Sequence, residues 1–192
     1  MITDEKFTKA TKEFDAIEKR GSFYNMAISL INNNFEMEAY FLILATWNFA
    51  RFRYAVNDFD INGFKEKIKE LNPYFDQLKD EDFRTINFNK YEEDIKKIFV
   101  TLSSIKGVEY TGASKIMHLK NRCVFIMWDG YIKGEKPKKY YNKLEIVKNG
   151  DWKIKRYWNN PEDYFQFLKD MQGRFKDINF QSNEKTFAKA ID

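Results

Sequence analysis

A glycine corner and a carboxylate lie 22 residues apart in the middle of the chain, and both are residue types that can act on a nucleic acid. Gly107 and Val108 stand between two segments with helical spacing, and Asp129 follows the apolar run 124–128. Glycine lets a backbone approach a phosphate closely, and the N-terminus of the second helix favours negative charge. A carboxylate stabilises developing positive charge and can orient an attacking water. The pattern predicts a DNA-binding helix–hairpin–helix element over about residues 91–132.

Cations and small residues near the corner support this interpretation. The expected phosphate contacts come from the corner backbone and from basic side chains close to it: Lys106, Gly107, Val108, Gly112, Lys120 and Arg122. Small side chains at residues 112–114 allow the two helices to pack closely. Residues 106–160 hold 13 Lys or Arg against 5 Asp or Glu, although the net charge of the whole chain is only +4. This polarity indicates a polyanion partner on one face, with a merely solvated lysine surface as the alternative.

The corner and the residues after it resemble the helix–hairpin–helix (HhH-GPD) superfamily of base-excision DNA glycosylases over about 28 residues. Gly107, Val108 and Ala113 are in register with that family's Gly-hydrophobic-Gly hairpin and Ala-rich helix. Residues 129–133, Asp-Gly-Tyr-Ile-Lys, are similar to the segment after the catalytic aspartate of adenine-specific members. The resemblance implies a protein that binds double-stranded DNA, flips out a damaged or mispaired base and hydrolyses its N-glycosidic bond. It implies that Asp129 stabilises positive charge on the sugar and positions the water.

Departures from the family pattern modify this expectation. Glu109 stands in place of the second hairpin glycine, and a carboxylate beside a phosphate-binding turn should weaken DNA affinity. Thr111 stands 18 residues before Asp129, where bifunctional members carry a lysine, so the resemblance implies a monofunctional enzyme without strong lyase activity. Lys115, one helical turn later, is the alternative nucleophile. The family's iron–sulfur cysteines are absent, and neither cofactor nor metal is expected.

A flipped base needs aromatic faces on which to stack. Candidates for this base pocket, with core packing as the alternative for each, are Trp47, Phe52, Trp128 and Tyr131.

Three polar residues of the same region have structural interpretations. Asp129 is also a good helix N-cap, which is compatible with a catalytic role. His118 is expected to be a satisfied buried histidine, and Cys123 a core or hairpin residue.

The elements that must position these residues are predicted to be helices of one all-α domain over residues 1–192, with two sublobes as an alternative. Helical spacing predicts helices over 3–19, 23–31, 36–56, 64–71, 73–79, 91–104, 111–119, 161–171 and 184–191. Expected caps are Ser22, Asn62 and Asn160, and a further helix should begin at Asp129. Residues 133–160 leave two interpretations open: a hairpin of 144–147 with 152–157, or a helix over 137–148.

Composition excludes several classes of protein. With 43% hydrophobic and 18% aromatic residues, the chain is not disordered overall. Its first 12 residues lack an apolar segment, so no secretory signal is expected, and the apolar stretch 39–50 is too short to span a bilayer. One cysteine and one histidine exclude an intramolecular disulfide and a Cys/His metal centre. We expect a cytoplasmic protein without a membrane partner, and the oligomeric state stays open.

Two further functions remain as alternatives. The chain could be a non-catalytic module that binds DNA or a repair partner, which Glu109 and Thr111 favour. It could also be a helical protein-interaction domain without a nucleic-acid role.

Overall fold

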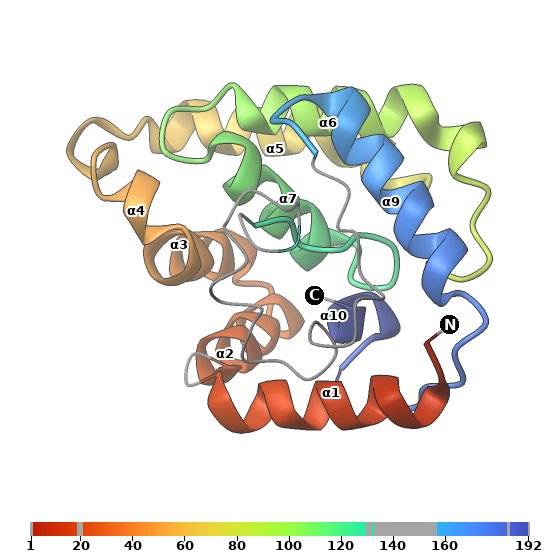
Figure 1. The fold of residues 1–192 in the computed structure, drawn as a ribbon. Helices are drawn as coiled ribbons and strands as arrows, with labels where there is room; N and C mark the ends of the chain where they lie inside the picture. The colour runs from red at the N-terminus through yellow and green to blue at the C-terminus, as the bar shows by residue number, and fades with distance from the viewer. Residues whose placement is uncertain (1, 19–20, 130–131, 133–156, 184, 192) are drawn as a thin grey trace.

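The computed structural model describes residues 2–18, 21–129, 132, 157–183 and 185–191, which form helices and loops without a strand (Figure 1). The helices of this part are α1 Asp4–Ile17, α2 Gly21–Asn32, α3 Glu36–Trp47, α4 Phe49–Phe52, α5 Ile61–Asp76, α6 Glu92–Ser103, α7 Glu109–Lys120, α9 Pro161–Phe175 and α10 Phe187–Ile191, with 3-10 turns η1 Val56–Asp58 and η2 Phe88–Tyr91. The predicted all-α class is confirmed.

Helix α7 lies in the middle of the fold (Figure 1). It packs against α3 and α6; α2 in turn packs on α3, and α5 and α9 pack on α6. All residues from Gly112 to Leu119 are buried, so α7 is covered on every side. Aromatic side chains fill much of the core, and the rings of Phe99 and Tyr164 stack with centroids 4.3 Å apart. Burying such rings is a large part of what stabilises a domain of this size.

Side-chain caps begin two of the helices, of which the cap at Asn160 was predicted and the cap at Thr3 was not. The Thr3 side chain accepts a hydrogen bond from the Lys6 N–H at the start of α1. The Asn160 side chain accepts one from the Asp163 N–H at 2.7 Å, and Pro161 occupies the first helical position of α9. Each bond satisfies one of the backbone donors that a helix start leaves without an internal partner.

Other helix boundaries were predicted wrongly. The expected long helix over 36–56 ends at Trp47, because Asn48 has a non-helical backbone, and a separate short helix α4 follows. The two expected helices over 64–71 and 73–79 are one helix, α5, whose cap is Asp60 rather than Asn62. Pro73 lies inside α5 instead of opening a new helix. Likewise α2 begins at Gly21, so Ser22 is inside the helix and not its cap.

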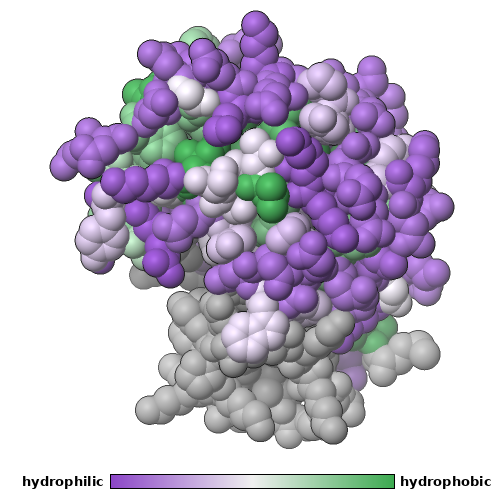
Figure 2. All heavy atoms as spheres, turned by 90° about the horizontal axis from the view of Figure 1, so that it is seen from above, coloured by the Kyte–Doolittle hydropathy of each residue, from purple (hydrophilic) through white to green (hydrophobic). Residues whose placement is uncertain are grey.

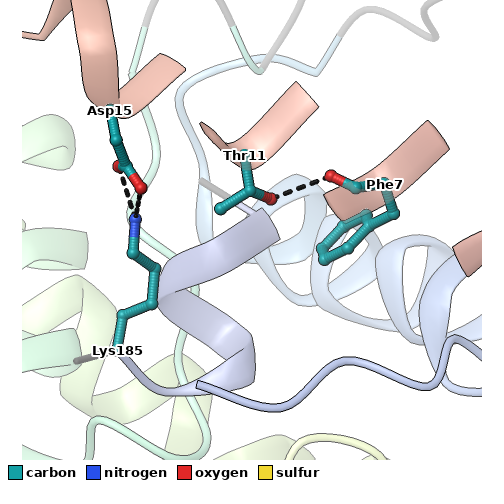
Figure 3. A network of polar contacts seen from close by, with 4 residues as sticks. All are labelled: Phe7, Thr11, Asp15 and Lys185. Atoms are coloured by element: carbon teal, nitrogen blue, oxygen red, sulfur yellow. Dashed lines mark hydrogen bonds and ion pairs between the residues drawn. The ribbon is translucent and has the colours of Figure 1, made fainter. Parts of the chain in front are cut away.

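The C-terminal segment closes the fold against α1 (Figure 3). The Lys185 ammonium binds both carboxylate oxygens of Asp15, and the Thr11 hydroxyl donates to the Phe7 carbonyl at 3.0 Å. The Phe7 ring packs against Phe187 of α10, with centroids 5.8 Å apart. The predicted final helix over 184–191 is therefore present over Phe187–Ile191, docked where the sequence placed it.

Two predictions concern residues outside the described ones. The helix alternative at 137–148 and Tyr131 lie outside the described residues, and so does the hairpin of 144–147 with 152–157 except for Tyr157.

Candidate nucleic-acid interface

Helices α6 and α7 meet at a tight corner formed by residues 104–108, as the sequence predicted. Gly107 has a φ of +88°, a backbone conformation that L side chains rarely adopt. Glu109, the first residue of α7, has a φ of +51°. Glu109 stands where the resembled family has its second hairpin glycine. Its backbone therefore has a conformation typical of glycine, although the residue is a glutamate.

Close packing fixes the two glycines of this region. A Cβ on Gly107 would lie 2.6 Å from the Ala55 Cβ, so the corner touches the residues after α4. A Cβ on Gly112 would lie 2.9 Å from both Leu44 and Asn48 side-chain atoms, where α7 crosses α3. Gly112 was expected to contact phosphate, but it is buried where these two helices cross.

Asn48 holds the corner from the other side of that crossing. Its amide nitrogen donates to the carbonyl oxygens of Gly107, at 2.9 Å, and Val108, at 3.0 Å, and only 4% of the residue is exposed. These bonds pull two corner carbonyls inward. The Glu109 N–H donates to the Ile105 carbonyl at 3.2 Å and the Gly112 N–H to the Val108 carbonyl at 3.0 Å, so the helix-start donors without an acceptor in α7 are those of Tyr110 and Thr111. This role of Asn48 was not predicted, although an asparagine that interrupts an apolar helical run was the available signal.

Exposed ion pairs flank the corner. The Glu109 carboxylate lies 3.4 Å from the Arg51 guanidinium, and the Lys106 ammonium lies 3.5 Å from the Asp58 carboxylate. All four side chains are largely exposed, so each pair contributes little stability and is readily exchanged for another partner. A phosphate approaching the corner would compete with these acids for the same cations.

The α4 turn, residues 48–55, presents aromatic and basic side chains beside the corner. Phe49 is 54% exposed and Tyr54 is 71% exposed. The Arg53 guanidinium lies over both rings, 5.6 Å from the Phe49 centroid and 4.5 Å from that of Tyr54. Polar side chains dominate the face that Figure 2 shows, and apolar groups appear there only in small patches. Phe52 is buried next to Gly107, so this pocket candidate belongs to the core.

Asp129 follows a residue, Trp128, whose backbone is hydrogen-bonded to α7. The Trp128 N–H donates to the Ser114 hydroxyl at 2.9 Å, and that hydroxyl lies 2.9 Å from the Thr111 carbonyl. Trp128 as a residue is 1% exposed and its ring packs on Tyr164, so this second pocket candidate is also in the core. The next residue, Asp129, is half-buried, and its Oδ1 accepts the Ile132 N–H at 3.1 Å. A capping contact for Asp129 is thus present, whereas the residues of the expected helix are not described.

Lys115 and Lys120 of α7 bind residues at the two ends of α3. The Lys115 ammonium is buried and donates to the carbonyl of Trp47, the last residue of α3, at 2.7 Å. The Lys120 ammonium lies 2.6 Å from the Glu36 carboxylate in the first turn of α3. Positive charge at a helix C-terminus is favourable. Only 5% of Lys115 is exposed. Both lysines therefore hold helices together in the fold.

Two other predicted residues are partly engaged. The Arg122 carbonyl accepts the Thr186 hydroxyl at 2.8 Å, and the residue is half-buried. Cys123 was expected in the core or in a hairpin; it is exposed, so the core position is wrong.

The remaining pocket candidate, Trp47, is half-buried and lies in an aromatic group. Its ring stacks on that of Tyr24, with centroids 6.0 Å apart and an interplanar angle of 14°. The Lys189 ammonium from α10 lies 4.8 Å from the Trp47 centroid. This group could not be predicted from the sequence, because its members come from three distant helices, α2, α3 and α10.

His118 is a satisfied buried histidine, as predicted. Its Nδ1 lies 2.6 Å from the Phe125 carbonyl, which can only accept, so Nδ1 carries the proton and Nε2 accepts the Tyr24 hydroxyl at 2.9 Å. Burial lowers the pKa of His118 to about 3, and Lys189 and Arg122 add to this, while the bond to Phe125 opposes it.

Hollows among the described residues lie at both ends of α7. One, of about 190 Å³, lies between the corner and the start of α5 and is lined by residues that include Asp58, Asp60 and Lys106. The other, of about 200 Å³, lies at the end of α7 around Asn121 and Arg122. Asp129 lines neither, and its neighbours Gly130 and Tyr131 are outside the described residues.

Comparison of the chain with protein-family models, curated proteins and solved structures gave no match. Within the described ranges, no helix is long and apolar enough to cross a membrane. The same residues contain no cluster of three or more His, Cys, Asp or Glu suited to a metal ion. Function is therefore inferred from the residues of the site.

Proposed function

We propose that the chain is a DNA glycosylase-like protein of the helix–hairpin–helix type, which hydrolyses the N-glycosidic bond of a damaged or mispaired base. The observation that carries this proposal is the backbone of the corner. Gly107 and Glu109 both adopt the left-handed conformation, at the spacing of the two glycines in the family hairpin. A single left-handed residue is common at turns, but two at this spacing before a buried helix are more specific.

In the proposed mechanism, the corner holds one phosphate and Asp129 acts on the sugar. The backbone N–H groups of Tyr110 and Thr111, in the first turn of α7, bind the phosphate, with Lys106 nearby. Asp129 stabilises the positive charge that develops on the sugar as the base leaves, and it orients the attacking water. The bond from Trp128 to Ser114 supports this role, because it fixes the carboxylate's origin to the same helix that begins at the corner.

The α4 turn provides a second DNA contact in this proposal. Arg51 and Arg53 supply positive charge, and Phe49 and Tyr54 supply exposed rings on which bases can stack. The turn is fixed to the corner through Asn48, so both surfaces would meet the duplex together.

Hydrolysis without strand cleavage is the expected outcome. Thr111 replaces the lysine of bifunctional members. The Lys115 ammonium is buried and bonded to the Trp47 carbonyl, and this position disfavours both Schiff-base formation and movement of the ammonium toward a sugar. A DNA glycosylase acts in the compartment that contains the DNA. The single cysteine of the chain is consistent with a reducing compartment, so we propose a cytoplasmic location.

The test is a panel of duplexes that carry oxidised, deaminated or alkylated bases. We expect at least one base to be released, leaving an abasic site that breaks only after alkali treatment. Covalent trapping of the protein on DNA by borohydride would contradict the monofunctional mechanism and restore Lys115 as the nucleophile.

A second candidate is a DNA-binding module without catalysis. It is favoured by the Glu109 carboxylate at the phosphate corner. Salt-dependent duplex binding without release of any base would support this candidate. Absence of duplex binding even at low salt would contradict both candidates and leave a protein-interaction domain.

A further inference from the structure

The α4 turn leaves two aromatic rings in contact with water. Tyr54 is 71% exposed and Phe49 is 54% exposed, and Val56 and Ile61, which follow along the chain, are each about half exposed. Aromatic side chains elsewhere in the described residues fill the core. Apolar surface left in water costs free energy that burial would recover, so a group of such side chains on one turn indicates a surface that contacts a partner.

A guanidinium group orders the two rings. Arg53 donates to the Tyr54 hydroxyl at 2.6 Å, and its guanidinium carbon lies near the centroids of both the Tyr54 and the Phe49 rings. This contact lowers the entropy cost of binding, because the side chains are arranged before a partner arrives, and it places positive charge beside the rings. Exposed rings interleaved with arginine are typical of surfaces that bind the bases and the phosphates of a single nucleic-acid strand.

The rings lie beside the corner that is proposed to hold a phosphate. A Cβ on Gly107 would lie 2.6 Å from the Cβ of Ala55, the residue directly after Tyr54. The Arg51 guanidinium, from the same short helix as Phe49, lies 3.4 Å from the Glu109 carboxylate at the corner. A strand whose phosphate is bound at the corner therefore has its neighbouring nucleotides at the α4 turn.

Unpaired bases are the partner that these rings can bind at least cost. In a fully paired duplex the faces of the bases are covered by stacked neighbours, and exposing a face requires unstacking or unpairing. A base in a bubble or a single strand already offers a face to an aromatic ring. The positive charge of Arg51 and Arg53 complements the phosphates of the same strand.

On the premise of the DNA glycosylase function above, we propose that the α4 turn binds unpaired bases next to the phosphate at the corner. The preferred substrate then carries its damaged base in an unpaired stretch of DNA rather than in a fully paired duplex. Phe49 and Tyr54 supply the stacking surface, and Arg53 holds both rings and adds charge.

The test compares two undamaged duplexes that share one strand. In the first this strand is fully paired, and in the second a short mismatched stretch leaves a bubble of unpaired bases. The dissociation constant of each is measured at the same salt concentration. We expect the bubble to bind about tenfold more tightly, because stacking on the rings is gained without the cost of unpairing. Tyr54→Ala and Phe49→Ala should each reduce this preference at least about threefold.

Phe35→Ala is the matched control. Phe35 is 52% exposed, close to the exposure of Phe49, but it precedes the first residue of α3, whereas the α4 turn follows the last. The substitution should leave the preference for the bubble unchanged. All three side chains are exposed, so we expect the variants to keep the fold.

The outcomes separate this inference from the proposed function. Equal binding of the two duplexes, or the same preference in all three variants, overturns the role of the α4 turn and leaves the glycosylase proposal intact. Self-association that Tyr54→Ala abolishes, together with equal binding of the two duplexes, assigns the turn to a second copy of the chain and also overturns the inference. Preference for the bubble without release of any base supports the inference and contradicts the catalytic proposal. Failure to bind either duplex contradicts the proposed function, and this inference with it.

Discussion

The side-chain amide of Asn48 donates to the carbonyl of Gly107 at 2.9 Å, across 59 residues of sequence. The same amide reaches the Val108 carbonyl, so one side chain from the end of α3 sets the shape of the α6–α7 corner. The corner is thus a tertiary feature: α3, α4 and α7 must all be in place before its backbone is fixed.

Asn48→Ala should lower the free energy of unfolding by about 3 kcal/mol, since two buried carbonyls lose their donor. Urea denaturation monitored by circular dichroism measures the change. Asn33→Ala is the matched control, because that exposed asparagine donates to a single carbonyl, of Ser29, and its loss should change stability by less than about 0.5 kcal/mol. Equal effects of the two substitutions would contradict the role assigned to Asn48.

Glu109→Gly should both relax the corner and strengthen DNA binding. A glutamate at a φ of +51° costs about 1 kcal/mol that glycine does not, and the substitution removes a carboxylate beside the proposed phosphate. We expect the dissociation constant for duplex DNA to fall about fivefold at low salt. Glu109→Gln removes the charge and keeps the strained backbone, so it should reproduce the gain in affinity without any gain in stability. Unchanged affinity in both variants would place the phosphate elsewhere.

Two glycines inside helices should respond to alanine in opposite directions. Gly112→Ala places a Cβ 2.9 Å from atoms of Leu44 and of Asn48, and the anchored Asn48 cannot move away, so we expect a loss of about 1–2 kcal/mol. Gly173→Ala in α9 meets no atom within 4 Å and should gain about 0.5 kcal/mol from helix propensity. Thermal and urea unfolding of both variants give the signs. A stabilising Gly112→Ala would show that α3 and α7 are not in close contact there.

The free energy of unfolding should decrease as the pH is lowered below about 6.5, because His118 is buried in its neutral form. Burial lowers its pKa to about 3 in the folded protein, against 6.5 for an ordinary histidine. Between these values the unfolded chain binds a proton that the folded protein does not, so the free energy of unfolding falls by up to about 1.4 kcal/mol per pH unit. Above pH 7 this contribution is constant.

The chain has one histidine, so its NMR signals report this directly. The ring resonances of His118 should not shift between pH 8 and pH 5. A titration midpoint near 6.5 would mean that the ring is accessible to water and that its bond to Tyr24 is not maintained.

The local parts of this structure were predictable from sequence, and the parts made by distant contacts were not. The start of α9 follows from the capping chemistry of Asn160, and the corner from Gly107, because each depends on a few neighbouring residues. The end of α3 at Asn48 was missed, since the apolar pattern continues through it and the break is stabilised by bonds to residues far along the chain.

The same limit applies to the candidate site. Trp47, Phe52 and Trp128 are equivalent as aromatic residues in the sequence, but only Trp47 is half-buried beside cations, whereas the other two are in the core. The partners that separate them, such as Tyr164 for Trp128, come from other helices.

The most direct test of the central claim is base release by Asp129→Asn beside the unaltered protein, with duplex binding measured on the same preparations. Asparagine keeps the shape of the side chain and an oxygen that can accept the Ile132 N–H, so the fold and the corner should be preserved. We predict that single-turnover base release falls by at least about a thousandfold while the dissociation constant for DNA changes less than about threefold. If Asp129→Asn releases bases as fast as the unaltered protein, the carboxylate does not act on the sugar and the catalytic proposal is wrong.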